Sequence, residues 1–194
     1  MAVLGHVDSG KTSLLDKVRG TGVQGREAGG ITQHIGASFL PDEIIQKLCG
    51  SLYEKLGKAE NKVPGILVID TPGHEVFTNL RARGGSAADI AILVVDINRG
   101  FQPQTNESLK ILESRKVPFV VALNKVDMIS GWQQTDDAYI SQAIKKQSPS
   151  IQTNIDEQIY NVVGALSILG YQSEAFYRVQ DFKKEISIVP VSAR

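Results

Sequence analysis

The chain has 194 residues, of which 42% are hydrophobic, and its 21 Lys and Arg balance its 21 Asp and Glu. This size and composition suit one globular domain, and the neutral net charge argues against a broad positive surface for non-specific nucleic-acid binding. No apolar stretch reaches the roughly 20 residues that a membrane helix needs. The single cysteine, Cys49, leaves no internal disulfide, and no signal peptide opens the chain, so we expect a cytoplasmic protein. We also expect a monomer without membrane contact.

Five apolar runs rich in β-branched residues lack polar alternation, which is typical of strands buried on both faces. They are AVL (2–4), ILVI (66–69), IAILVV (90–95), FVVAL (119–123) and ISIVPV (186–191). Helical spacing lies between them, at 11–19, about 75–87 and 105–115. This alternation predicts an α/β fold: a doubly wound, mainly parallel six-stranded sheet with helices on both faces.

Two segments depart from this rhythm. Residues 20–38 contain six glycines, so we expect a loop that is mobile unless a ligand orders it. Residues 128–185 form an insert in which apolar residues repeat with a 3.6-residue period, and a helix of about 19 residues there would be near 28 Å long. The helix would start at Pro149 and end before Gly170. We interpret 1–194 as one domain with this insert, cut from a longer multidomain protein, because the chain stops directly after its last strand.

The stretch GHVDSGKT (residues 5–12) matches G-x-x-x-x-G-K-[ST] between a predicted strand and a predicted helix, the context that a phosphate-binding loop requires. Its glycines let backbone N–H groups surround phosphate oxygens, while the Lys11 ammonium reaches the β and γ phosphates. Thr12 would supply a hydroxyl to Mg²⁺, and the His6 side chain would face outward. This loop alone leaves ATP and GTP equally open. The nucleotide-binding residues expected here are Asp8, Ser9, Gly10, Lys11, Thr12 and Ser13.

The stretch NKVD (residues 124–127) follows the run FVVAL and indicates which base the nucleotide carries. The Asp127 carboxylate can accept hydrogen bonds from guanine N1–H and its 2-amino group, whereas adenine offers a lone pair and no amine there. A polar mismatch of this kind discriminates by about 10⁴ or more. Asn124 and Lys125 complete this motif, and SAR, from Ser192 to Arg194, would add the N–H of Ala193 toward guanine O6. The sequence therefore favours a guanine nucleotide.

Two further segments are expected near the γ-phosphate. Asp70 follows the run GILVI and should hold Mg²⁺ through a water molecule, while the Gly73 N–H should meet the γ-phosphate. Thr32 in GGIT is the candidate for a second Mg²⁺ hydroxyl. Both segments would then respond to whether GTP or GDP is bound.

The motifs GHVDSGKT, GGIT, DTPGH, NKVD and SAR occur in that order and resemble the G domain of translational GTPases. More narrowly, VQGREAGGITQHIGASFLP, GILVIDTPGHEVFTNLRARGGSAADIAILVVDINRGFQPQT and NKVDMISGW resemble the family of translation initiation factor 5B and bacterial initiation factor 2, over nearly the whole chain. The resemblance implies hydrolysis of GTP to GDP and phosphate at a low intrinsic rate. It also implies stimulation by the large ribosomal subunit, in a switch that promotes the joining of ribosomal subunits.

The same resemblance implies residue roles. His74 would position the attacking water, behind a hydrophobic gate formed by Val7 and Ile31. The Asp8 carboxylate and the Gly30 carbonyl would hold a monovalent cation, K⁺ or Na⁺, near the β and γ phosphates. Such a charge would act like an arginine finger, which is worth roughly 10³ to 10⁵ in rate where one exists.

Alternatives to this switch stay open. The chain could be the nucleotide-binding module of another, elongation-factor type of translational GTPase, or a trimmed domain that binds GTP or GDP without useful turnover. A P-loop ATPase or kinase is opposed by NKVD. Contact with initiator tRNA is implied only for family domains that this chain lacks.

Overall fold

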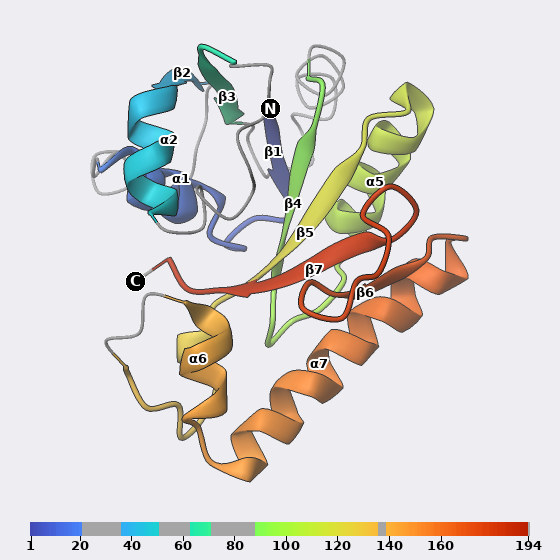
Figure 1. Ribbon diagram of the computed structural model, residues 1–194. Helices are drawn as coiled ribbons and strands as arrows, with labels where there is room; N and C mark the ends of the chain where they lie inside the picture. Colours follow the sequence, from blue (N-terminus) through green and yellow to red (C-terminus); the bar gives the residue numbers. More distant parts are fainter. Residues whose placement is uncertain (21–35, 51–62, 71–87, 136–138, 194) are drawn as a thin grey trace.

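The fold is built on one seven-stranded sheet with the order β2-β3-β1-β4-β5-β7-β6 (Figure 1). It is seen in a computed structural model that describes residues 1–20, 36–50, 63–70, 88–135 and 139–193. Among these strands only the pair β2–β3 is antiparallel. The predicted α/β class and the mainly parallel sheet are confirmed. The strands are β1 (Ala2–Gly5), β2 (Gly36–Pro41), β3 (Gly65–Asp70), β4 (Ala91–Asp96), β5 (Phe119–Asn124), β6 (Ser173–Ala175) and β7 (Ile186–Val191).

The prediction of six strands is wrong, because the described residues contain seven. Both edge strands, β2 and β6, lie outside the five apolar runs. The first has the sequence GASFLP and is mostly half-buried or exposed, and it begins inside the segment 20–38 that we expected to be a loop. The second has only three residues and lies inside the insert. Edge strands bury one side at most, so neither carries the continuous apolar run that identifies a central strand.

The helices follow the predicted alternation. Residues 11–19 form α1 as expected; α5 begins two residues before the predicted position 105, because Pro103 stands at its start and a capping box joins Gln102 and Thr105. The insert helix α7 has 20 residues instead of about 19 and begins at Pro149 as predicted. The helix predicted at 75–87 lies outside the described residues. The described helices are α1 (Lys11–Arg19), α2 (Asp42–Cys49), α5 (Pro103–Arg115), α6 (Ile140–Lys145) and α7 (Pro149–Ile168), with a 3₁₀ turn η4 (Val126–Met128).

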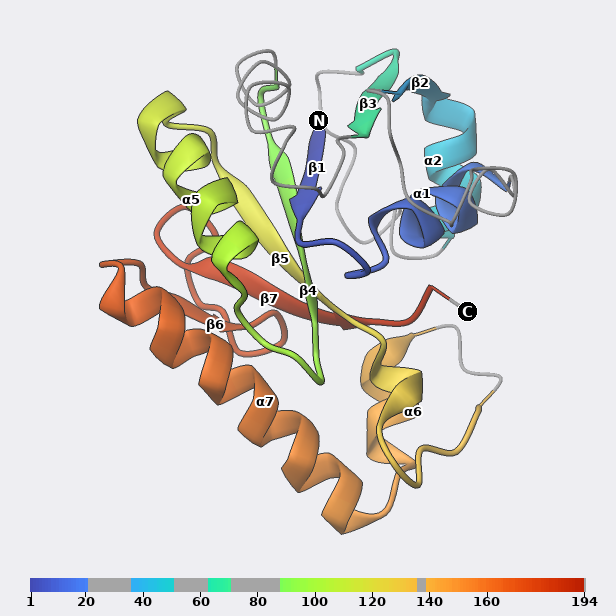
Figure 2. The same cartoon turned by 180° about the vertical axis from the view of Figure 1, so that it is seen from behind.

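Helices cover both faces of the sheet, as predicted. Figure 2 shows α5 and α7 on one side of the strands and α1 and α2 on the other. On the first side, Leu112 and Ile159 are buried together with Leu93 and Leu123 of the strands, in the larger of the two core clusters that the described residues form. On the second side, Leu15 of α1 packs with Val3 of β1. Each such side chain contributes about 1.5–3 kcal/mol through burial, so the central strands are firmly held.

The central strands bring the sequence motifs to one edge of the sheet. Parallel pairing aligns Gly5 of β1 with Val94 of β4, and Asp96 of β4 with Asn124 of β5. On the other side of β5, Asn124 is opposite Val191 of β7. The loops that follow these strands therefore lie next to one another, at the carboxyl edge where α/β sheets bind ligands. Within the described part of the chain, none of the helices is long and apolar enough to span a membrane.

Candidate nucleotide-binding site

The P-loop connects β1 to α1 through backbone conformations that depend on glycine. Gly10 has φ 91° and precedes the first residue of α1. A Cβ atom on Gly10 would lie 2.2 Å from the Asn124 side-chain nitrogen, and a Cβ on Gly5 would lie 2.3 Å from the Val94 carbonyl oxygen. Both positions therefore exclude any larger residue without rearrangement. The loop ends at a helix N-terminus, whose N–H groups and dipole favour an anion.

Lys11 is buried at the start of α1. The ammonium of Lys11 donates a hydrogen bond to the His6 carbonyl oxygen at 2.8 Å. Thr12 and Ser9 are also buried, while Ser13 is half-buried. A buried ammonium at a helix N-terminus gives this loop a concentrated positive potential, which suits the phosphates of a nucleotide.

The NKVD stretch, called the guanine motif below, is hydrogen-bonded directly to the P-loop. The Asn124 side-chain NH₂ donates to the Ser9 carbonyl oxygen at 2.9 Å, across 115 positions of sequence. The Asn124 amide oxygen and the Ser9 hydroxyl are buried and have no hydrogen-bond partner among the described residues. Buried polar atoms are rarely left without partners, and clustering of such atoms fits a site whose ligand supplies hydrogen bonds.

The SAR motif contacts the guanine motif. The Ser192 hydroxyl donates to the Asp127 carboxylate at 2.8 Å. Asp127 lies in η4, which follows Lys125 in a left-handed conformation with φ 70°. Ala193 comes directly after Ser192 and is half-buried. Three of the predicted motifs thus meet at one edge of the sheet, through contacts that span 115 and 65 positions of sequence.

The prediction that the His6 side chain faces outward is wrong. His6 is only 3% exposed, and both of its ring nitrogens lack a hydrogen-bond partner among the described residues. Burial first, and then the charge of Lys11, lower the pKa of His6 to about 4 although Asp96 opposes this, so the imidazole is neutral at pH 7. The reason is tertiary: β1 is a central strand, and α5 packs against it. Gln104 of α5 even accepts a hydrogen bond from the Val7 N–H at 3.0 Å.

Two predicted magnesium ligands, Thr12 and Asp70, are buried at the ends of neighbouring elements. Thr12 is buried in the first turn of α1. Asp70 is buried at the end of β3, opposite Val3 of the neighbouring β1. A hydroxyl and a carboxylate are hard oxygen donors of the kind that Mg²⁺ prefers, so these residues fit that ion.

For two other predicted residues, the structure gives the position but no contact that bears on the predicted role. Val7 is half-buried and Asp8 is exposed, with φ 62°. The remaining predicted residues lie outside the described part of the chain, so their roles stay predictions. These are Gly30, Ile31, Thr32, Gly73, His74 and Arg194.

Two residues near the motifs escaped the sequence analysis. Asp96, at the end of β4, pairs with Lys125, and Gln104 contacts the P-loop backbone. A signal for the first was present: ILVVD ends in an acid just as ILVID does before Asp70, and an acid at the carboxyl end of a buried strand points into this edge of the sheet. The second had no signal, since Gln104 is an ordinary polar residue in the first turn of a helix.

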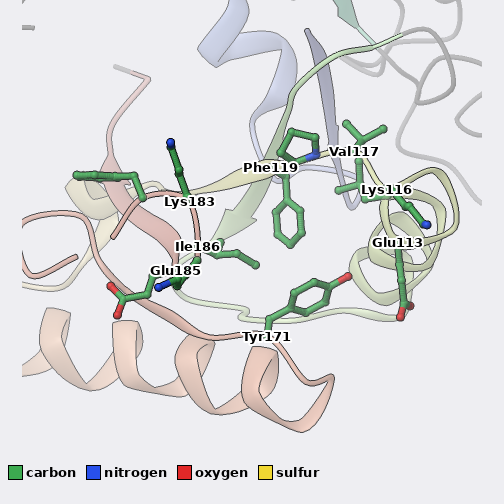
Figure 3. A pocket seen from close by; sticks show the side chains of 12 residues that line it. Glu113, Lys116, Val117, Phe119, Tyr171, Lys183, Glu185 and Ile186 are labelled. Atoms are coloured by element: carbon green, nitrogen blue, oxygen red, sulfur yellow. The ribbon is translucent and has the colours of Figure 1, made fainter. Parts of the chain in front are cut away.

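A separate cavity of about 350 Å³ lies away from the motifs, between the end of α5 and the segment before β7 (Figure 3). The rings of Phe119 and Tyr171 meet edge to face in its wall, 5.4 Å between centroids. Burial, and then the Glu113 carboxylate, raise the pKa of Tyr171. Phe119 begins β5 whereas Asn124 ends it, so this cavity lies at the opposite end of that strand and does not belong to the nucleotide site.

The fold and the joined motifs define a P-loop domain of the guanine-nucleotide-binding class. The sequence model of the elongation factor Tu GTP binding domain family matches residues 1–194, and the chain belongs to that family.

Within this family, the chain is most clearly similar to translation initiation factors. "Probable translation initiation factor IF-2" of Methanopyrus kandleri is 55% identical over 192 residues, which cover 99% of this chain and 32% of the relative. The protein of the same name in Thermococcus onnurineus is 55% identical over 194 residues, which cover 100% of this chain and 32% of the relative. The chain thus spans about a third of the length of these relatives.

Solved structures show the same similarity to initiation factors. The crystal structure of GDP-bound aIF5B from Aeropyrum pernix superimposes with a TM-score of 0.80 at 52% identity, covering 99% of this chain and 32% of that one. A bacterial selenocysteine-specific elongation factor EF-Sec, at 24% identity and a TM-score of 0.60 over 99% of this chain and 25% of that one, is similar in fold alone. The predicted resemblance to the initiation factor 5B family is confirmed.

Proposed function

We propose that this chain is the GTP-binding and GTP-hydrolysing domain of a translation initiation factor. The observation that carries the proposal is the hydrogen bond from Asn124 to the Ser9 carbonyl, which joins the phosphate loop to the guanine motif. High identity to IF-2 relatives over the whole chain supports the step from nucleotide binding to initiation.

The chain's own residues divide the work of nucleotide binding. The Asp127 carboxylate would accept hydrogen bonds from guanine N1–H and the 2-amino group. The hydrogen bond from the Ser192 hydroxyl fixes the orientation of this carboxylate. Lys11 and the N–H groups of the P-loop would bind the phosphates. Thr12 and Asp70 would hold Mg²⁺, which neutralises charge on the β and γ phosphates when it is bound.

Hydrolysis would depend on residues that the resemblance implies. His74 would orient the attacking water, Gly73 would contact the γ-phosphate, and Val7 with Ile31 would form the hydrophobic gate. A second Mg²⁺ contact from Thr32 completes this part of the proposal.

A monovalent cation, K⁺ or Na⁺, is proposed between the Asp8 carboxylate and the Gly30 carbonyl. In this position it would add positive charge near the β and γ phosphates as hydrolysis proceeds.

The whole protein would act on the ribosome in the cytoplasm. Ribosomal subunit joining, stimulation by the large subunit and contact with initiator tRNA would involve parts of the relatives that this chain does not span. We expect the chain itself to be a monomer.

Calorimetric titration tests the proposal. Purified chain is titrated with GTP, GDP and ATP in Mg²⁺, in matched K⁺ and Na⁺ buffers. We expect binding of both guanine nucleotides and none of ATP, because adenine leaves the Asp127 carboxylate without hydrogen-bond donors. ATP binding as tight as that of GTP would refute the proposed specificity. Release of phosphate with ribosomes present then separates a GTPase from a domain that only binds nucleotide.

A further inference from the structure

Asp96 is a buried acid outside all of the nucleotide-binding motifs. It is the last residue of β4, and its side chain is 5% exposed. One carboxylate oxygen accepts a hydrogen bond from the Lys125 ammonium at 2.8 Å. The other accepts from the Asn98 N–H at 2.9 Å. Both oxygens are thus engaged, so the carboxylate has a fixed orientation.

The backbone around Asp96 is tied to the guanine motif. In the parallel pairing of β4 with β5, Asp96 lies opposite Asn124. The Ile97 N–H donates to the Asn124 carbonyl oxygen at 2.9 Å, and the Gly100 N–H donates to the Asp96 carbonyl oxygen at 2.8 Å. The acid therefore cannot move away from NKVD without breaking the sheet edge.

Lys125 is the residue that this acid holds. It occupies a left-handed conformation that is uncommon for a residue other than glycine, and it directly precedes η4, which carries Asp127. Its side chain runs past the P-loop, since a Cβ atom on Gly10 would lie 3.9 Å from the Lys125 Cε. A lysine side chain has four flexible carbons, so it stays in such a place only when its ammonium has a fixed partner.

The charge of Asp96 persists at neutral pH. Burial by itself raises the pKa of Asp96, but the hydrogen bonds from Lys125 and Asn98, together with the charge of Lys125, outweigh it and leave the pKa below its ordinary value. The Lys125 side chain is 24% exposed, whereas that of Asp96 is 5% exposed. Asp96 is therefore the fixed partner of the pair, and Lys125 lies closer to the surface of the site.

We propose that Asp96 is a positioning residue of the nucleotide site, which holds the Lys125 side chain of the base-binding motif along the phosphate-binding loop. A nucleotide that reaches from Lys11 to Asp127 must pass this side chain. The inference rests on the proposed function, and it adds an acid at the end of β4 to the residues that determine guanine nucleotide affinity. Since Lys125 belongs to the base-binding motif NKVD, the effect should be the same for GDP and GTP.

The substitution Asp96→Asn tests the inference because it keeps the shape of the side chain and removes its charge. We expect the Kd for GDP and for GTP to rise about 10- to 100-fold, the usual weight of a hydrogen bond between charged groups, through faster dissociation. Calorimetry measures both affinities, and stopped-flow release of a fluorescent GDP analogue measures the rate. The matched control is Asp156→Asn, which removes the acid of the exposed Arg178–Asp156 ion pair and should leave both Kd values within about twofold.

A double-mutant cycle separates positioning from general destabilisation. If Asp96 acts through Lys125, then Asp96→Asn should change the Kd less than about twofold in a Lys125→Met background. Equal losses in both backgrounds, or an Asp96→Asn chain that binds GDP as tightly as the unchanged chain, would overturn the inference. Should Asp96→Asn not fold, Lys125→Met removes the same ion pair at its more exposed partner, and undiminished GDP affinity together with an unchanged release rate would overturn the inference in the same way. An unchanged chain that binds no guanine nucleotide would instead refute the proposed function itself.

Discussion

The P-loop edge of the sheet and the insert helix α7 differ in how their interiors are arranged. At the P-loop edge, buried polar atoms of Ser9 and Asn124 lack partners among the described residues, and Lys125 adopts a rare backbone conformation. In α7, the buried residues are aliphatic, such as Ile155 and Ile159. Unpaired polar atoms and unusual dihedral angles cost stability, and they persist where a ligand is bound. The edge is therefore built for binding and α7 for stability.

The largest expected effect concerns hydrolysis. In the whole protein with ribosomes, His74→Ala should lower GTP turnover by about 10²- to 10⁴-fold, the usual contribution of a group that handles the reacting water. Phosphate release measures the rate, and calorimetry should give an unchanged Kd for GDP. Turnover equal to that of the unchanged protein would remove His74 from the proposed mechanism.

Stability without loss of binding is the expected signature of α7. Ile159 is fully buried, so Ile159→Ala should lower the free energy of unfolding by about 2–5 kcal/mol through lost burial and a cavity. Urea unfolding measures this, and the Kd for GDP should stay the same for the fraction that is folded. The control on the same helix is Gly164→Ala, whose added Cβ meets no atom within 4 Å; it should raise stability by about 0.5–1 kcal/mol. A clear loss of GDP affinity in folded Ile159→Ala would show that α7 is coupled to the site.

The pH dependence of stability should expose the polar interior of the P-loop edge. His6 has a pKa of about 4 in the folded chain against 6.5 when unfolded, so the unfolded chain binds more protons between these values. Its contribution to stability is complete above pH 6.5 and is lost as the pH falls toward 4, a loss of about 3 kcal/mol. Urea unfolding without nucleotide should show this. In His6→Leu, which places a side chain there that cannot titrate, the loss between pH 7 and pH 4 should be smaller by that amount, and equal losses in the two chains would contradict a neutral, buried His6.

Much of the fold was predictable because the central strands carry their own signal. The runs at β1, β4 and β5 are apolar without alternation, since most of their residues are buried on both faces. The runs at β3 and β7 carry the same apolar signal, although Leu67 of β3 is exposed. The edge strands β2 and β6 were missed because a strand with one covered face, or with three residues, has no such run. Helix α7 was predicted nearly to the residue, because Pro149 and the periodic isoleucines mark its start and its buried face.

By itself, the sequence determined the class of site, since the P-loop and NKVD motifs specify chemistry through residue type and spacing over a few positions. Only the tertiary structure decided which atoms meet across the sheet. The contact of Asn124 with Ser9, the pairing of Asp96 with Lys125 and the burial of His6 all depend on the strand order β1-β4-β5. Local spacing encodes motifs, but the neighbours of a strand are chosen by the packing of the whole sheet, and that choice set the electrostatic surroundings of each motif.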